Sequence, residues 1–293
     1  MARRSTPRPD VTTPAVIRAG EAVEHRWGDA ISGMVGDEVL LSSSRLHALI
    51  FTLAPGARFG HSPDNRTVFR ADEVYLVLEG SLLAIDPELG QVVRANAGEC
   101  VFFRRDTWHH GFNDGTTAVR VLELFAPPPA AGASSEYART RPYLETALAA
   151  DDRVLGRWPM ERAAIETDAR LRVMRPPDHL LRLEADLVVG LVASTEHLTA
   201  AIAELRPGGS GPVRAFGGDV CIHLTAGTVH IHVPDGDRTW FSAREGDTFV
   251  APAGVAFGLV NQGSAAARMA IGAAPAWLPP VAQAAPPEPS SAA

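Results

Sequence analysis

Short runs in which apolar and polar residues alternate dominate the chain. LHALIFTL, EVYLVLEG, ECVFFRR and VRVLELFA are rich in β-branched and aromatic residues, and Gly, Asp and Pro turns separate them. This rhythm is typical of an all-β sandwich or barrel. Between residues 130 and 167 a Pro/Ala/Ser-rich stretch is followed by helix-compatible sequence such as LETALAADDRVL. We therefore predict an all-β protein whose strand-rich parts are joined by a short, partly helical linker.

The strand pattern occurs twice along the chain. The segment SRLHALIFTLAPG, which ends at Gly56, matches TEHLTAAIAELRPG, which ends at Gly208. Later landmarks recur at a nearly constant separation, Gly98 as Gly246 and Asn113 as Asn261. Order and spacing that are both kept indicate a duplicated domain.

The duplication predicts the domain boundaries. We place one barrel at residues 15–129, a linker at 130–167 and a second barrel at 168–276. Residues 1–14 and the Ala/Pro/Ser-rich residues 277–293 offer too little apolar surface for a packed core, so we expect both ends to be disordered.

Candidate chemistry is concentrated in the first copy. Glu73 opens the apolar run EVYLVLE, where a carboxylate is costly unless a cation or hydrogen-bond donors meet it. Tyr75 is two residues further and shares the face of Glu73 on a strand. His61 lies upstream in a loop, and His109 and His110 follow downstream.

These residues resemble the two motifs of the cupin superfamily. Gly56, His61, Glu73 and Gly80 fall on the first motif, and Gly98, His109 and Asn113 fall on the second. The duplication makes the chain similar to a bicupin, which implies two tandem double-stranded β-helix (jelly-roll) barrels. The resemblance also implies a metal site formed by His61, Glu73 and His109. A second motif histidine is missing, because Ser62 and Pro63 follow His61.

Two imidazoles and one carboxylate suit a divalent ion with open positions, Fe(II) first, with Mn, Ni, Zn or Cu as alternatives. We expect His110 and Tyr75 to be the acid/base candidates beside this metal site. In the second copy Val220 stands where Glu73 does and Phe257 where His109 does. The second barrel is therefore expected to hold no metal.

Three functions are compatible with this pattern. The leading hypothesis is a non-heme Fe(II) dioxygenase that acts on a small organic substrate chelated to the metal. The first alternative is a lyase or isomerase that uses the ion as a Lewis acid, and the second is a non-catalytic small-molecule-binding barrel. The resemblance does not choose among them, because a fold does not fix a function.

Composition narrows the partners and the location. The net charge of −7 and the absence of a basic stripe argue against nucleic acid. No apolar run is long enough to span a membrane, and the basic start lacks an apolar segment behind it, so we expect a cytoplasmic protein.

All 27 basic side chains are arginine, which excludes mechanisms that use a lysine as a Schiff base or as a general base. Arg104 and Arg105 are interpreted either as surface charge or as a site for an anionic substrate. Because barrel edges need covering, we expect a homodimer.

Overall fold

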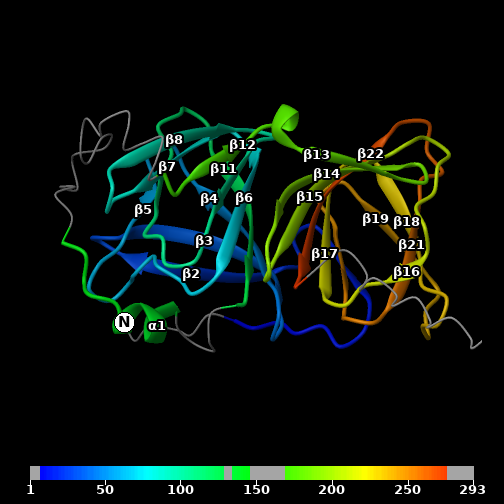
Figure 1. Cartoon of the computed structure of the whole chain (residues 1–293), viewed down its shortest axis with the longest axis horizontal. Coiled ribbons are helices and arrows are strands. Elements are labelled where there is room, and N and C mark those ends of the chain that lie inside the picture. The colour runs from blue at the N-terminus through cyan, green and yellow to red at the C-terminus, as the bar shows by residue number, and fades with distance from the viewer. Residues whose placement is uncertain (1–6, 129–133, 146–168, 276–293) are drawn as a thin grey trace, which may run out of the picture.

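Two β-barrels lie side by side in the computed structural model, which describes residues 7–128, 134–145 and 169–275 (Figure 1). The strands of the first half are β1 (Ala15–Ile17), β2 (Val23–Asp29), β3 (Gly33–Ser42), β4 (His47–Leu53), β5 (Arg58–Phe59), β6 (Asp72–Glu79), β7 (Ser81–Asp86), β8 (Gln91–Asn96), β9 (Cys100–Phe103), β10 (His110–Phe112) and β11 (Val119–Ala126). Helix α1 (Ser134–Thr140) follows. The predicted all-β fold with a partly helical connection is confirmed.

The second half repeats this succession of strands. They are β12 (Arg172–Met174), β13 (Leu180–Glu184), β14 (Leu187–Ser194), β15 (Thr199–Leu205), β16 (Arg214–Ala215), β17 (Asp219–Ala226), β18 (Thr228–His232), β19 (Trp240–Arg244), β20 (Thr248–Ala251), β21 (Ala256–Val260) and β22 (Ala267–Ala274), with a 3-10 turn at Pro176–Asp178. Most of the helix expected at LETALAADDRVL lies outside the described residues. The described residues contain no helix long and apolar enough to cross a membrane.

Each barrel consists of a seven-stranded and a four-stranded sheet. The first barrel pairs the orders β12-β9-β6-β11-β4-β3-β2 and β5-β10-β7-β8, and the second pairs β1-β20-β17-β22-β15-β14-β13 and β16-β21-β18-β19. The glycines that revealed the duplication explain why it is visible in the sequence. Gly98 and Gly246 have φ of 84° and 85°, and Gly80 and Gly227 both have 78°. Because residues with a side chain rarely adopt this backbone conformation, both copies keep glycine at these turns.

The two barrels exchange one short strand each. Strand β1 pairs with β20 of the second barrel, and β12 pairs with β9 of the first. The structure thus departs from the predicted boundaries at these two strands. It also describes residues 7–14, which we expected to be unfolded: the Pro9 carbonyl accepts a hydrogen bond from the Ser42 amide, and Val11 packs on the core between the barrels. This segment leads into β1 along that junction.

The two seven-stranded sheets pack against each other at the centre of the molecule (Figure 1). Strands β6 and β11 are buried on both faces, since Val74, Leu76 and Leu124 face the second barrel while Tyr75 and Val121 face their own barrel. The opposing strand β22 carries Gly272, where a Cβ atom would lie 2.8 Å from Cδ2 of Leu124. This double burial explains why these strands are nearly continuous apolar runs in the sequence.

Candidate functional site

The interior of the first barrel contains a cluster of buried polar side chains. Glu73 and Tyr75 come from β6, Glu123 from β11 and Asp37 from β3, and His109 immediately precedes β10. The ladder register explains their meeting: Tyr75 lies opposite Glu123, and Glu73 lies opposite Phe125 on the same strand pair. All five are buried, with Glu73 1% and His109 2% exposed. We call these five residues the polar cluster.

The Glu73 carboxyl group is the most unusual member of the polar cluster. Its Oε2 atom is buried without a hydrogen-bond partner among the described residues and lies 3.7 Å from Nε2 of His109. Burial raises the pKa of Glu73 well above its ordinary value, and the negative charge of Glu123 adds to the effect. Burial therefore favours the neutral, protonated form of this carboxyl group.

Glu123 links the polar cluster together through hydrogen bonds with Tyr75 and Glu73. Two carboxyl groups form such a bond only when one of them carries a proton, so the pair holds at least one proton. Burial, followed by the charge of Asp37, raises the pKa of Glu123 to about 8. Burial also raises the pKa of Asp37 to about 7 and that of Tyr75 well above its ordinary value.

His109 is enclosed by aromatic rings. The centroid of its ring lies 4.6 Å from that of Phe103, 5.5 Å from Phe69 and 6.1 Å from Phe59. Phe59 reaches this position only because Gly111 has no side chain, since a Cβ atom there would lie 2.2 Å from the Phe59 ring. Burial lowers the pKa of His109 to about 4. The site thus places a carboxyl group whose protonated form is favoured by burial beside a neutral imidazole that could accept a proton.

His61 lies in a different group of contacts. Its Nδ1 atom is 2.7 Å from Nε2 of His110, and its Nε2 atom is 2.7 Å from the carbonyl oxygen of Leu144. Because a carbonyl only accepts, His61 donates from Nε2, and its Nδ1 accepts the N–H of His110. Burial lowers the pKa of both histidines, which keeps this pair neutral.

The predicted metal set is only partly brought together. Glu73 and His109 face each other, and the Tyr75 ring centroid lies 5.9 Å from that of His109. His61 instead contacts His110 and the carbonyl oxygen of Leu144. Among the described residues, no group of three or more His, Cys, Asp and Glu side chains is arranged to hold a metal ion. In this structure the Nε2 atom of His61 is engaged by the carbonyl of Leu144, and the assignment of His61, Glu73 and His109 as metal ligands stays a prediction.

Sequence reasoning missed Glu123 and Asp37. A signal for Glu123 was present, because Val119, Val121, Glu123 and Phe125 alternate with the other residues of β11 and so share one face. A lone carboxylate on the apolar face of a strand is costly and needs partners. The same argument applies to Asp37, which follows Val35 and precedes Val39 on the inward face of β3.

The second barrel has an apolar side chain at each equivalent position. Val220 and Ile222 occupy the places of Glu73 and Tyr75 on β17, and Ile222 pairs with Ile271 as Tyr75 pairs with Glu123. Phe257 occupies the place of His109, and its ring packs on Phe216 and Phe249 at 5.2 Å between centroids. The polar cluster is thus a property of the first barrel.

Comparisons with known proteins agree with this architecture. Residues 49–125 match the family model "Cupin domain". The chain resembles the putative glyoxylate induced protein of Pseudomonas aeruginosa, with 15% identity, a TM-score of 0.63 and coverage of 94% of this chain and 92% of that one. Residues 49–125 thus match a cupin domain, and with its two barrels the whole chain resembles bicupins in fold.

Other solved structures share this fold at low identity. Lactobacillus farciminis oxalate decarboxylase, solved as a formate complex, is 16% identical with a TM-score of 0.58 and coverage of 91% of this chain and 87% of that one. A Bacillus subtilis oxalate decarboxylase structure, described for its Mn(II) centres, is 13% identical with a TM-score of 0.58 and coverage of 91% and 78%. A comparison with curated proteins finds no match. At these identities the likeness shows the fold alone.

Proposed function

We propose that the first barrel is an acid–base catalyst that acts on a small organic molecule, of the lyase or isomerase type. The observation that carries the proposal is the facing pair of Glu73 Oε2 and His109 Nε2, 3.7 Å apart, in an interior whose duplicate contains only apolar residues at the same positions. Glu73 would donate a proton and His109 would accept one, with Tyr75 and Glu123 holding the Glu73 carboxyl group in place. General acid–base catalysis by positioned side chains typically contributes about 10²- to 10⁴-fold to a rate.

Proton exchange tests this proposal directly. The purified chain is incubated in D2O, with EDTA and without O2, with a panel of small 2-oxo, 2-hydroxy and dicarboxylic acids, and ¹H NMR follows both conversion and loss of carbon-bound protons to solvent. Glu73→Gln and His109→Gln are expected to lower the rate by about 100-fold or more. Matched controls are Glu204→Gln and His230→Gln, which lie on the second barrel. Equal rates in the wild type and in both cluster variants would refute the proposal.

A divalent metal ion is the second candidate for the same site, and the unpartnered Oε2 atom of Glu73 favours it. A carboxylate and a neutral imidazole are ligand types that bind Fe(II), Mn, Ni, Zn and Cu. Glu73 and His109 would be the two protein ligands, and the ion would supply Lewis-acid chemistry or, as Fe(II) with O2, the oxidative chemistry of a dioxygenase.

Metal analysis separates the two candidates. Protein purified without chelator is examined by elemental mass spectrometry, and oxygen uptake is followed with the same panel of acids. About one equivalent of metal that is lost in both Glu73→Gln and His109→Gln, together with activity abolished by EDTA, would support the metal-dependent enzyme. Full activity in EDTA with no bound metal would support the acid–base enzyme.

A further inference from the structure

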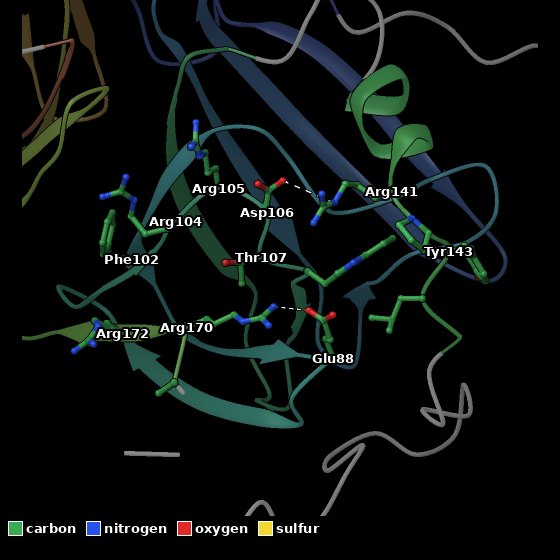
Figure 2. A pocket seen from close by; sticks show the side chains of 14 residues that line it. Glu88, Phe102, Arg104, Arg105, Asp106, Thr107, Arg141, Tyr143, Arg170 and Arg172 are labelled. Carbon is green, nitrogen blue, oxygen red and sulfur yellow. Dashed lines mark hydrogen bonds and ion pairs between the residues drawn. The ribbon is translucent and has the colours of Figure 1, made fainter. Parts of the chain in front are cut away.

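A pocket of about 640 Å³ lies beside the first barrel, outside the polar cluster (Figure 2). Three stretches of chain and one turn residue line it: residues 102–108 from β9 to His109, residues 141–144 after α1, residues 169–172 leading into β12, and Glu88. Residues 169–172 belong to the second half of the sequence. The pocket therefore exists only because β12 crosses to the first barrel.

The lining of this pocket is strongly cationic. Five arginines line it, namely Arg104, Arg105, Arg141, Arg170 and Arg172, and the acidic lining residues are Glu88 and Asp106. The whole chain carries a net charge of −7, so this concentration of positive charge runs against the overall balance. A pocket lined by one sign of charge raises the local concentration of ions of the opposite sign.

Three of these guanidinium groups are fixed by carboxylates. Arg104 pairs with Asp72 at 2.8 Å and with Glu196 of the second barrel at 2.7 Å. Arg170 pairs with Glu88, and Arg141 lies 4.0 Å from Asp106 (Figure 2). These ion pairs hold the wall in one conformation, which lowers the entropic cost of binding a ligand.

Arg105 and Arg172 also line the pocket. Within the described ranges no carboxylate pairs with either guanidinium group, and both residues are exposed. Arg172 lies opposite Phe102 in the β9–β12 ladder, which fixes its backbone in a regular strand. Each guanidinium group offers a planar fork of N–H donors that matches a carboxylate with two parallel hydrogen bonds.

Apolar side chains complete the pocket. Trp108 is buried in the wall, Phe102 is half-buried, and Tyr143 is 39% exposed. Figure 2 shows Arg104 and Arg172 on the side of Phe102, with Arg141 and Tyr143 on the opposite side. Arg172 and Arg141 thus lie on opposite sides of the pocket, which suits an anion whose charges are separated by a carbon skeleton. A compact inorganic anion would reach only one side.

We propose that this pocket binds a small organic polycarboxylate with two or three carboxylate groups. Arg105 and Arg172 would form charge-assisted hydrogen bonds with the carboxylates, and Phe102 and Tyr143 would contact the carbon skeleton. This site is separate from the polar cluster and does not depend on the function proposed for it. Its volume lies within the range of about 300–1,000 Å³ that small-molecule sites occupy.

Calorimetry of the full chain with tricarballylate, which has three carboxylates on a flexible skeleton, tests the proposal. A hydrogen bond to a charged group contributes about 1.5–3 kcal/mol, so Arg105→Gln and Arg172→Gln are each expected to weaken binding about tenfold or more. Raising the salt concentration is expected to weaken binding further, because the attraction is screened. Tyr143→Ser is expected to weaken it about threefold through loss of ring contact.

The controls are arginines outside the pocket and anions without a carbon skeleton. Arg94→Gln and Arg268→Gln remove exposed arginines that pair with Asp114 and Glu204, and they are expected to bind tricarballylate as the wild type does. Inorganic phosphate and sulfate are expected to bind at least tenfold more weakly. Unchanged affinity in Arg105→Gln and Arg172→Gln would overturn the site. Equal affinity for phosphate would overturn the polycarboxylate as its ligand.

Discussion

The interiors of the two barrels differ at five equivalent positions while their surroundings match. Asp37, Glu73, Tyr75, His109 and Glu123 of the first barrel correspond to Val189, Val220, Ile222, Phe257 and Ile271 of the second. The residues just before Glu73 and Val220 illustrate the match: Asp72 accepts a hydrogen bond from the Arg105 amide, and Asp219 accepts one from the Ala253 amide. One scaffold thus supports a polar and an apolar interior.

This difference separates a barrel whose interior is apolar from a barrel whose interior contains ionisable groups. Every interior position of the second barrel that corresponds to the polar cluster belongs to its apolar core. The first barrel instead buries carboxyl groups that are costly to remove from water, as the raised pKa values of Glu123 and Asp37 indicate. A protein retains such groups against their cost mainly at functional sites.

Moving a carboxylate into the second barrel gives the largest expected effect. Val220→Glu buries a charge-bearing side chain in an apolar core, and we expect the free energy of unfolding to fall by about 3–5 kcal/mol at pH 7. Urea unfolding followed by circular dichroism measures it. Val220→Ile is the control for side-chain size. A loss below 1 kcal/mol for Val220→Glu would mean that the second interior accepts a carboxylate as the first does.

The reverse exchange in the first barrel is expected to act in the opposite direction. Glu73→Val removes the unpartnered Oε2 atom and makes the strand like β17. We expect the free energy of unfolding to rise by about 1–3 kcal/mol, because an apolar replacement of a buried ionisable group is often stabilising. The same denaturation measurement applies, with Glu79→Val at the exposed end of β6 as the control. A clear destabilisation would show that the Glu73 contacts favour folding.

The pH dependence of stability sharpens the comparison at Asp37. Burial raises its pKa to about 7, whereas an unfolded chain titrates near 3.8. The folded state therefore binds a proton that the unfolded state releases, and its stabilising contribution is complete below about pH 4 and is lost as pH rises through 7. Asp37→Asn is expected to lessen the fall in unfolding free energy between pH 5 and pH 8 by about 1–2 kcal/mol. Parallel pH profiles for the wild type and Asp37→Asn would contradict the shift.

The outer edges of the two barrels differ as well, with the smallest expected effect on folding. Strand β2 exposes Glu24 and Arg26, whereas the equivalent edge strand β13 exposes Leu181 at 70% and Leu183 at 62%. We propose that β13 forms the contact of a homodimer, because exposed apolar edges favour association. Leu181→Glu is expected to halve the mass measured by light scattering and to change the unfolding free energy of the monomer by less than about 0.5 kcal/mol. A wild type that is monomeric would contradict the dimer.

The fold could be predicted because its landmarks are local. Gly80 and Gly98 have a positive φ, and so do Gly227 and Gly246 in the second copy. Because this backbone conformation favours glycine, the duplication can be recognised from the sequence. Tyr75 was predicted because strand alternation places it on the face of Glu73, and His109 was predicted from the resemblance to the second cupin motif. Their meeting with Glu123 depends on the register of β6 and β11, which follows from long-range pairing.

Two features could not be predicted from the sequence for the same physical reason. The direction of His61 is set by the carbonyl of Leu144, which lies far along the chain. The strands β1 and β12 have three residues each, which is too short for a pattern that specifies a partner. The arginine-lined pocket also depends on β12. From the sequence only Arg104 and Arg105, which form one of its walls, could be predicted as candidates for anion binding.

The exchange of β1 and β12 also bears on how such a chain can evolve. A duplicated half without chemistry is ordinarily free to be deleted. Here deletion of the second half would remove the strand that borders β9, and deletion of the first half would remove the strand that borders β20. Each half thus depends on a strand from the other, which gives a reason to retain the second copy although its positions equivalent to the polar cluster are all apolar.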